Sequence, residues 1–143
     1  MQQVIIAITL LFSSVLVAQT KTTSVLENRA FVKVSVVNAL SDKGEVRFAL
    51  FNKENFMKQP VAALASTIKE GVSTVVFENV LKGEYAIICF HDENNNKQLD
   101  FNENGIPIES FGVSNNVINY GPPQFDTSKF DVENNAVNLE IKF

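Results

Sequence analysis

Apolar and polar side chains alternate along much of the chain with a period of two residues. Val32, Val34 and Val36 alternate with polar neighbours, and residues 45–50 repeat the same pattern. This alternation predicts strands that bury one face and expose the other. Residues 41–44, Ser-Asp-Lys-Gly, lie between the two runs and have turn chemistry, with a glycine that can take a positive φ. The two runs are therefore predicted to form a hairpin.

Similar runs continue through the rest of the chain. They predict strands over residues 61–69, 72–78, 84–90 and 137–143. Residues 52–60 are expected to form one or two helical turns that end at Pro60, since proline cannot continue a helix. Two long stretches, 92–105 and 112–133, interrupt the pattern and are expected to be functional or pinned loops. About seven short strands with frequent turn signals predict an all-β, antiparallel sandwich.

The first eighteen residues, 1–18, contain no charged side chain and hold a short apolar run. The run is too short to span a bilayer comfortably, and Ala18 offers a small residue at a cleavage position, which predicts a secretory signal peptide. A membrane anchor or a buried strand is the alternative that this segment leaves open. Residues 19–29 are polar and aperiodic, so we expect a flexible leader, followed by one domain over residues 30–143.

The chain carries twelve Lys and Arg against sixteen Asp and Glu, a net charge of −4 that lies wholly after the signal segment. Nucleic acid is not an expected partner, because neutralising phosphates needs clustered cations. The one cysteine, Cys89, lies in an apolar run and is interpreted as a small buried residue outside any intrachain disulfide. The signal segment has no cysteine for lipidation, so we expect a soluble protein, secreted or periplasmic, without a membrane span in its mature part.

The most specific chemistry lies in residues 92–103, Asp-Glu-Asn-Asn-Asn-Lys-Gln-Leu-Asp-Phe-Asn-Glu. Oxygen-bearing groups occupy alternate positions and the last one, the spacing of a loop that wraps calcium. The predicted ligands are, in order, Asp92, Asn94, Asn96, the Gln98 carbonyl, Asp100 and Glu103. Calcium takes about six to eight oxygen ligands, often with a bidentate carboxylate as the last. Three carboxylates expected around one point would also repel one another unless a cation lay between them.

Lys97 departs from this pattern because it holds the sixth position, where helix-flanked loops of this type need glycine. A left-handed lysine costs about 1 kcal/mol, and its charge lies near the ion. We therefore expect weak affinity, about 10⁻⁴–10⁻³ M. A helix-loop-helix site is excluded, since the residues before Asp92 are predicted to form a strand. A loop that asparagine hydrogen bonds stabilise without any ion is the alternative.

The loop Asp92-x-Asn94-x-Asn96-x-x-x-Asp100-x-x-Glu103-x-Gly105-Ile106 resembles the calcium loops in the B-type repeats of Gram-positive surface adhesins, which lie on transthyretin-like sandwiches. Residues 77–85, with a Gly-x-Tyr entry to a strand, are similar to those sandwiches too. A wider resemblance, over about residues 32–143, is to a family of small exported bacterial proteins classed as a domain of unknown function. It is carried by residues 85–86, 90–94, 105–107 and 109–116. The resemblance implies an immunoglobulin-like or transthyretin-like sandwich and export, with no established activity.

Catalysis is not expected from this sequence. His91, the only histidine, ends a strand, where a structural imidazole is the commoner case. Cys89 has no activating neighbour on its own strand face, because adjacent strand residues point to opposite sides. A cation that protein oxygens wrap completely has no open position for a substrate. We therefore expect a protein that is not an enzyme.

The second function class is an extracellular binding module for a surface protein or a carbohydrate. Its contact surface would use the segment 111–130. The candidates for apolar contacts lie in or beside the irregular segments and are Phe101, Phe111, Tyr120 and Phe125. The chain has twelve phenylalanines, most of them expected in the core, and no tryptophan to stack on a sugar ring. Packing of an extended strap on the core is the simpler interpretation of Phe125 and Phe130.

Overall fold

The computed structural model of the chain describes residues 29–118 and 121–143. The predicted signal peptide, 1–18, and all of the predicted leader except Arg29 lie outside the described residues. The elements are β1 (Arg29–Val36), β2 (Glu45–Phe51), β3 (Ala62–Thr67), β4 (Ser73–Leu81), β5 (Gly83–Asp92), β6 (Phe111–Val113), η1 (Ser114–Asn116), α2 (Phe125–Ser128), β7 (Phe130–Val132) and β8 (Val137–Ile141). In the part of the chain that is described, no helix has the length and apolar character needed to cross a membrane.

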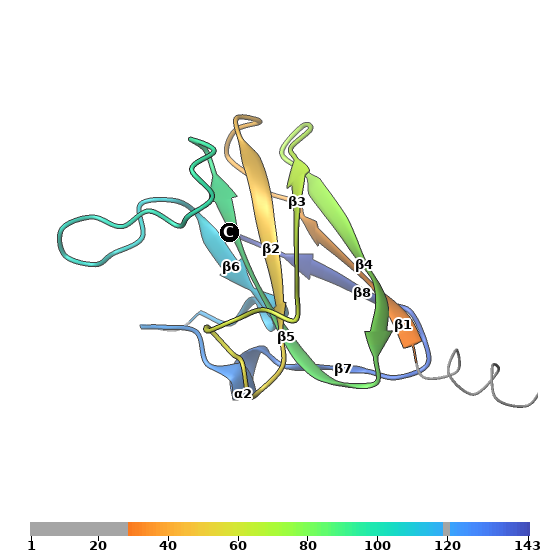
Figure 1. The fold of residues 1–143 in the computed structure, drawn as a ribbon. Helices are drawn as coiled ribbons and strands as arrows, with labels where there is room; N and C mark the ends of the chain where they lie inside the picture. The colour runs from red at the N-terminus through yellow and green to blue at the C-terminus, as the bar shows by residue number, and fades with distance from the viewer. Residues whose placement is uncertain (1–28, 119–120) are drawn as a thin grey trace, which may run out of the picture.

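The strands form two layers (Figure 1). One sheet has the order β4-β1-β8 and the other the order β3-β2-β5-β6, while β7 pairs with β5. The predicted all-β sandwich is therefore confirmed, with eight strands in place of about seven. One pairing differs from the antiparallel prediction, because β1 and β8 run parallel, with Val32 opposite Val137. Parallel neighbours need a long connection, and the chain between these two strands supplies it.

The hairpin predicted for the first two strands is wrong. β1 and β2 belong to different sheets, and each pairs with strands from later in the chain. The period-two pattern identified the buried face of each strand correctly, but it carries no information about which strand lies alongside. Their connection therefore crosses from one layer to the other.

The turn in that connection is nevertheless held firmly. The two carboxylate oxygens of Asp42 accept hydrogen bonds from the backbone N–H groups of Glu70 and Gly71, each at 2.9 Å. Gly44 has a φ of 68°, the positive value that its turn position predicted. A Cβ atom at Gly44 would lie 2.0 Å from the carbonyl oxygen of Asp92, so the close approach of the two segments also requires glycine.

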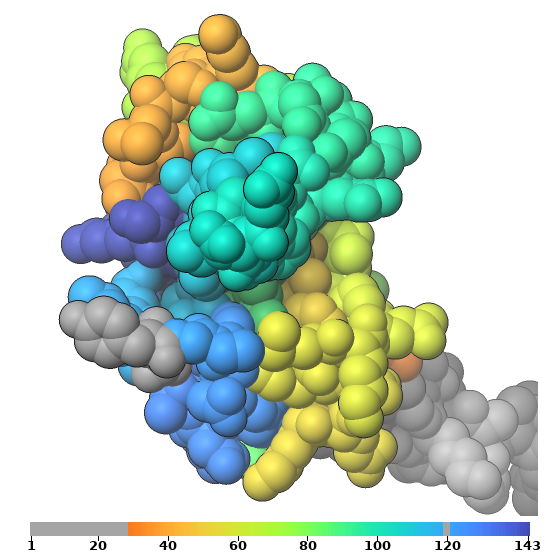
Figure 2. Space-filling view, turned by 90° about the vertical axis from the view of Figure 1, so that its left-hand side faces the viewer, coloured from red at the N-terminus to blue at the C-terminus, as the bar shows by residue number. Residues whose placement is uncertain are grey.

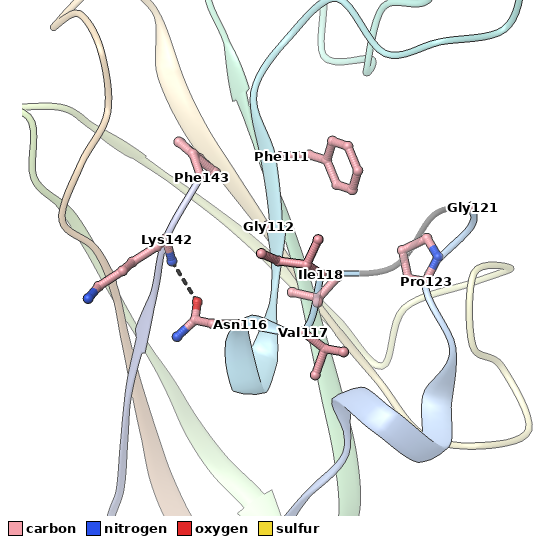
Figure 3. Close-up of a pocket in the computed structure, with 10 residues that line it drawn as sticks. Phe111, Gly112, Asn116, Val117, Ile118, Gly121, Pro123, Lys142 and Phe143 are labelled. Atoms are coloured by element: carbon pink, nitrogen blue, oxygen red, sulfur yellow. Dashed lines mark hydrogen bonds between the residues drawn. The ribbon is translucent and has the colours of Figure 1, made fainter.

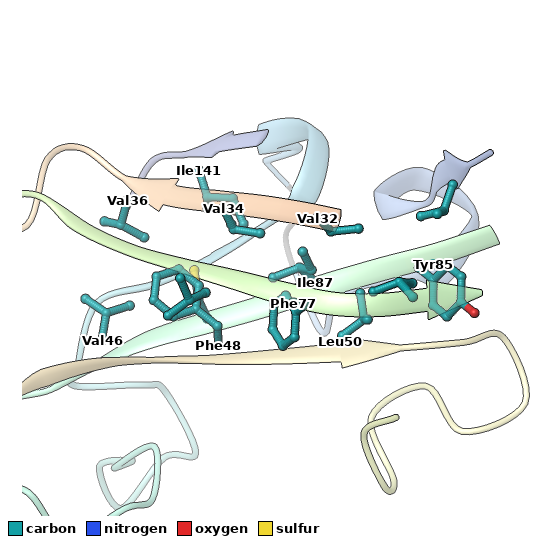
Figure 4. Packing of buried hydrophobic residues seen from close by; sticks show 14 of the residues in the cluster. Val32, Val34, Val36, Val46, Phe48, Leu50, Phe77, Tyr85, Ile87 and Ile141 are labelled. Carbon is teal, nitrogen blue, oxygen red and sulfur yellow. The ribbon is translucent and has the colours of Figure 1, made fainter. Parts of the chain in front are cut away.

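The hydrophobic core fills the space between the two sheets (Figure 4). β1 contributes Val32, Val34 and Val36, which lie across from Phe48 and Leu50 of β2. Each of these side chains is at most 1% exposed. The alternating positions noted in the sequence are thus the positions that the core uses, because successive strand residues point to opposite faces. Cys89 is fully buried in the same core and forms no disulfide, as predicted.

Two irregular segments differ from their predictions. Residues 52–60 form a series of turns and not a helix, with the Lys58 N–H bonded to the Asn55 carbonyl oxygen at 2.9 Å. The segment 112–133, expected to be a loop, contains β6, η1, α2 and β7. Each of these elements has three or four residues, too few for a period to be recognisable.

Asparagine and serine side chains join this second segment to the strands around it. The Ser114 hydroxyl, fully buried, accepts the Ile87 N–H at 2.9 Å. Asn116 donates from Nδ2 to the Glu140 carbonyl oxygen and accepts the Lys142 N–H at Oδ1, at 2.9 and 2.8 Å. These bonds tie β6 and η1 to β5 in one sheet and to β8 in the other.

Candidate metal centre

The predicted ion-binding loop follows β5 directly and projects from the end of its sheet (Figure 1). Figure 2 looks onto this loop, coloured teal, with the yellow segment after β2 and the blue segment around α2 below it. β5 ends at Asp92, so the last strand residue is also the first predicted ligand. The strand predicted before the loop is present, which agrees with the exclusion of a helix-loop-helix site.

Asp92 holds the first half of the loop by hydrogen bonds to the backbone. Its Oδ1 accepts the Asn96 N–H at 3.0 Å and its Oδ2 accepts the Lys97 N–H at 2.9 Å. The side chain is fully buried. Lys97 has a φ of 66°, so the left-handed conformation expected for the sixth loop position is confirmed. Asn95 is also left-handed, with a φ of 59°.

Three further predicted ligands lie against one another. Asn94 donates from Nδ2 to the Asp100 carboxylate at 2.6 Å, and Asn96 donates to both oxygens of the same carboxylate at 2.9 and 3.0 Å. The Oδ1 atoms of Asn94 and Asn96 accept the N–H groups of Asn96 and Gln98. The structure therefore brings together the side chains of Asn94, Asn96 and Asp100, with Asp92 bonded to the same turn of backbone.

Glu103 is placed apart from this group. The Oδ1 atom of Asn102 accepts the N–H groups of Asn104 and Ile106, at 3.0 and 2.9 Å, and so forms a tight turn. The turn closes a small hairpin in which Phe101 lies opposite Pro107. Glu103 lies exposed at the tip of this hairpin.

The expected gathering of three carboxylates is therefore not found. Across residues 29–118 and 121–143, no three His, Cys, Asp or Glu side chains form a group able to hold a metal ion. Glu103 instead lies exposed in the turn that Asn102 closes and forms no hydrogen bond with Asp92 or Asp100 among the described residues. Gln98 enters the network only through its N–H group, which donates to Asn96.

The sequence analysis missed one acidic residue of this region, Glu109. Its Oε1 accepts the N–H of Glu93 and its Oε2 accepts the N–H of Asp100, both at 3.1 Å. The residue is buried, with 9% of its surface exposed. One carboxylate thus joins the two ends of the loop. The partners of Glu109 are backbone N–H groups, which every residue has, so the identity of the partner residues could not predict this contact. Its place shortly after Gly105-Ile106-Pro107 was the sequence feature that pointed to it.

His91 and Cys89 lie on the opposite face of β5, directed into the sandwich. The Nε2 atom of His91 donates to the Lys43 carbonyl oxygen at 2.7 Å, and the ring stacks on Phe143 with centroids 6.4 Å apart. Its Nδ1 atom is buried without a hydrogen-bond partner. Burial raises the pKa of the Cys89 thiol far above its usual range. Both side chains are completely buried, so neither reaches a substrate at the surface.

Apolar side chains cluster on the same face as the loop. A groove of about 440 Å³ is lined by apolar residues of several segments, among them Leu99, Phe101, Phe111, Pro122 and Pro123. A second groove, of about 420 Å³, shares Phe111, Gly121 and Pro123 with the first and is shown in Figure 3. Both hollows are lined by Phe111 and Pro123 of the predicted 111–130 surface.

The other aromatic residues proposed for that surface are used differently. Phe125 is buried and packs edge-on against Phe56, with ring centroids 5.5 Å apart. Phe130 packs against the core, so both follow the strap interpretation. Tyr120 lies outside the described residues.

Comparison with known proteins adds one finding. No curated protein and no solved structure matches the chain. A family model described as "Uncharacterized protein conserved in bacteria (DUF2141)" matches residues 34–140, which span β2 to β7, most of β8 and the end of β1. The match covers well over half of the sequence and includes the whole candidate centre. The chain therefore belongs to this bacterial family of uncharacterized proteins.

Proposed function

We propose that residues 92–103 bind a calcium ion and that the ion stiffens the loop of a protein exported from the cell, to the periplasm or beyond. The convergence of Asn94, Asn96 and Asp100 beside the Asp92 carboxylate is the observation that carries the proposal. Four of the six residues nominated by spacing lie in one hydrogen-bonded group. All of them offer oxygen atoms, the ligands that calcium prefers.

The hydrogen bonds of the loop leave oxygen atoms available for a cation. An ionised carboxylate has about four acceptor sites, and each oxygen of Asp92 uses one of them for a backbone N–H. Asn94 and Asn96 direct their N–H groups at Asp100. A half-turn of either amide would direct its oxygen there instead, in exchange for the backbone N–H bond that this oxygen now accepts. A cation would then replace these N–H donors as the partner of the Asp100 carboxylate.

Two residues are candidates for the carboxylate that completes the ligand set. Spacing assigns it to Glu103, which lies at the hairpin tip. Glu109 is the second candidate. It accepts hydrogen bonds from the backbone N–H groups of Asp100 and of Glu93, the residue after Asp92. Variants of the two residues therefore form part of the test.

The proposed role of the ion is structural. Extracellular calcium is about millimolar in many settings, so an affinity near 10⁻⁴ M would stabilise the fold by roughly 1–1.5 kcal/mol. A domain of this size would then unfold roughly 3–8 °C higher. Ordering of the loop would also protect its backbone from proteolysis.

The test is thermal unfolding of the chain from Gln19 onward, in excess chelator, in calcium and in magnesium. We expect a higher midpoint with calcium than with magnesium, and no calcium effect in Asp100→Asn. Loss of the effect in Glu103→Ala but not in Glu109→Gln would assign the closing ligand to Glu103, and the reverse result would assign it to Glu109. Glu78→Ala, a change of an exposed β4 glutamate, is the matched control. Identical curves in all three solutions would refute calcium binding.

The proposal assigns no reaction to the protein. Support comes from the burial of the two side chains with the chemistry for catalysis, His91 and Cys89. The His91 imidazole is held by the Lys43 carbonyl oxygen, and the raised pKa keeps the Cys89 thiol protonated at neutral pH. A structural role for both residues accounts for these contacts.

A second candidate function is binding of an extracellular protein or glycan on the apolar face around Phe111. The two grooves that flank Phe111 favour it, together with the exposed side chains of Phe101 and Ile106. Binding on peptide or glycan arrays that Phe111→Ser abolishes and Asp100→Asn leaves intact would support this function. Equal binding by both variants would exclude that face.

A further inference from the structure

Asn104 and Gly105 form a pair that occurs once in this chain. Sixteen asparagines are present, and Asn104 is the one that a glycine follows. Such a pair is chemically labile, because the backbone nitrogen of the following residue can attack the side-chain amide of asparagine, and glycine has no side chain to hinder the attack. Whether the pair reacts depends on how the fold holds these two groups.

The fold exposes this pair. Both residues lie exposed at the tip of the small hairpin after the predicted ion-binding loop. The hairpin belongs to the segment between β5 and β6, which extends away from the sheets (Figure 1). Apart from the glycine and its two chain neighbours, no heavy atom of the described residues lies within 4 Å of the position that a Cβ atom of Gly105 would occupy. The surroundings of the pair are therefore open to solvent.

The side chain of Asn104 is also unrestrained. Its backbone N–H donates to Oδ1 of Asn102 at 3.0 Å, but its side-chain amide forms no hydrogen bond with any of the described residues. Other asparagine side chains are held, such as those of Asn96, which bonds Asp100, and Asn116, which bonds β8. The Asn104 amide is therefore free to rotate toward the backbone nitrogen of the next residue.

One hydrogen bond opposes the reaction. The Gly105 N–H donates to the Asn102 carbonyl oxygen at 2.9 Å, and this bond must open before the nitrogen can lose its proton and attack. Bonds in exposed turns open at little cost in free energy, whereas those of core strands open only when the whole fold does. The folded hairpin therefore slows the reaction without preventing it.

We propose that Asn104 is a site of spontaneous deamidation and isomerisation. The Gly105 nitrogen loses its proton to hydroxide and forms a bond to Cγ of Asn104, while the bond from Cγ to the amide nitrogen breaks and ammonia leaves after taking up a proton. Water then attacks one of the two carbonyl carbons of the resulting five-membered imide and breaks the bond from that carbon to the ring nitrogen. Opening at Cγ leaves aspartate, and opening at the backbone carbonyl leaves isoaspartate.

The products would alter one wall of the apolar groove. Isoaspartate adds a carbon to the backbone of a hairpin in which Phe101 lies opposite Pro107 and the Asn102 N–H bonds the Ile106 carbonyl oxygen at 2.9 Å. Phe101, Ile106 and Pro107 all line the groove of about 440 Å³. Either product also carries a negative charge next to Glu103. The modification would therefore change both the shape and the charge of this face.

Mass spectrometry of the folded full chain, expressed with its natural N-terminal segment, tests the proposal after prolonged incubation at neutral pH. We expect aspartate and isoaspartate at Asn104 before any other asparagine has reacted. Asn104→Gln should give no product at this position, because glutamine would have to form a larger ring. The denatured chain should react faster, since the bond to Asn102 is then absent. An unmodified Asn104 in the folded protein, over a time in which the denatured chain reacts completely, would overturn the proposal.

Lys97→Gly provides a matched second pair, because Asn96 would then also precede a glycine, at a φ of 66° that glycine tolerates. The Asn96 amide bonds the Asp100 carboxylate, and the N–H of residue 97 bonds the buried Asp92 carboxylate at 2.9 Å. We therefore expect Asn96 to react about tenfold or more slowly than Asn104 in this variant, since each bond that must break raises the barrier. Chelator in the incubation makes the outcome independent of calcium. Reaction at Asn96 as fast as at Asn104 would overturn the assignment, because the dipeptide alone would then decide the rate.

Discussion

Single asparagine and aspartate side chains hold the irregular parts of this protein in place. Asn102 closes the hairpin after the loop, Asn116 fastens η1 to β8, and Asp42 fixes the connection between the sheets. In each case a side-chain oxygen accepts one or two backbone N–H groups that have no strand partner. Short polar side chains reach nearby backbone groups readily, which explains why this chain uses them where strands end.

Asp42 provides a pH-dependent prediction. Hydrogen bonds from the N–H groups of Gly71 and then Glu70 lower the pKa of its carboxyl below the ordinary 3.8, so the charged form stabilises the folded state. That stabilisation is complete above the unfolded pKa and is lost as pH falls through the lower, folded pKa. Asp42→Asn should be less stable near neutrality, and its deficit should shrink below about pH 3.8. Thermal midpoints from about pH 6 to about pH 2.5 would measure this, and a constant deficit would contradict it.

The conformation or burial of single residues in and beside the loop was predictable only where the neighbouring sequence determines it. The left-handed Lys97 followed from its place at the sixth loop position, and burial of Cys89 followed from its apolar neighbours. The role of Glu109 did not, because its partners are the backbone of Glu93 and Asp100. The spacing of ligands also did not predict that Glu103 lies exposed in the turn that Asn102 closes.

Strands of five or more residues were evident from their periodicity, whereas their partners were not. The burial pattern of β2 repeats every two residues, and this repeat would be the same whether β2 paired with β1 or with β5. Partner choice depends on contacts between segments that are distant in sequence. Alternation of apolar and polar residues therefore could not predict that the chain crosses to the other sheet after β1, or that β1 pairs with β8 in parallel.

The Asn116 contact with β8 leads to a prediction about this element. Asn116→Gly removes both hydrogen bonds but tolerates the φ of 53°, and should destabilise the fold by about 1–2 kcal/mol. Asn116→Ala should cost about 1 kcal/mol more, since alanine disfavours a left-handed conformation. Chemical denaturation would give both values. Equal stability of wild type and Asn116→Gly would show that water replaces the amide at no cost.

For the whole molecule, the sandwich is a rigid base that places a polar loop and an apolar face side by side. β5 ends at the first loop ligand, and β6 carries Phe111 next to the hairpin of Phe101 and Pro107. The ion, if bound as proposed, would order this hairpin and with it one wall of the apolar groove. Both candidate functions therefore use the same end of the fold.

The proposed export leads to a prediction about cleavage of the N-terminal segment. Expression with its own N-terminal segment should deliver the protein outside the cytoplasm, with cleavage after Ala18. The measurement is fractionation followed by N-terminal sequencing of the purified protein, for which we expect Gln19 as the first residue. An intact N-terminus at Met1 in the cytoplasmic fraction would refute the signal peptide.

The parallel pairing of β1 with β8 also bears on when the protein folds. Val32 cannot meet Val137 until all of the elements between them have been synthesised, so the sheet of β4, β1 and β8 is completed only after β8 has emerged. Contacts between such distant segments slow folding, because a long loop must close before any of them forms. Such a delay would suit the proposed export, because the polypeptide could be threaded through a membrane before its sandwich closes.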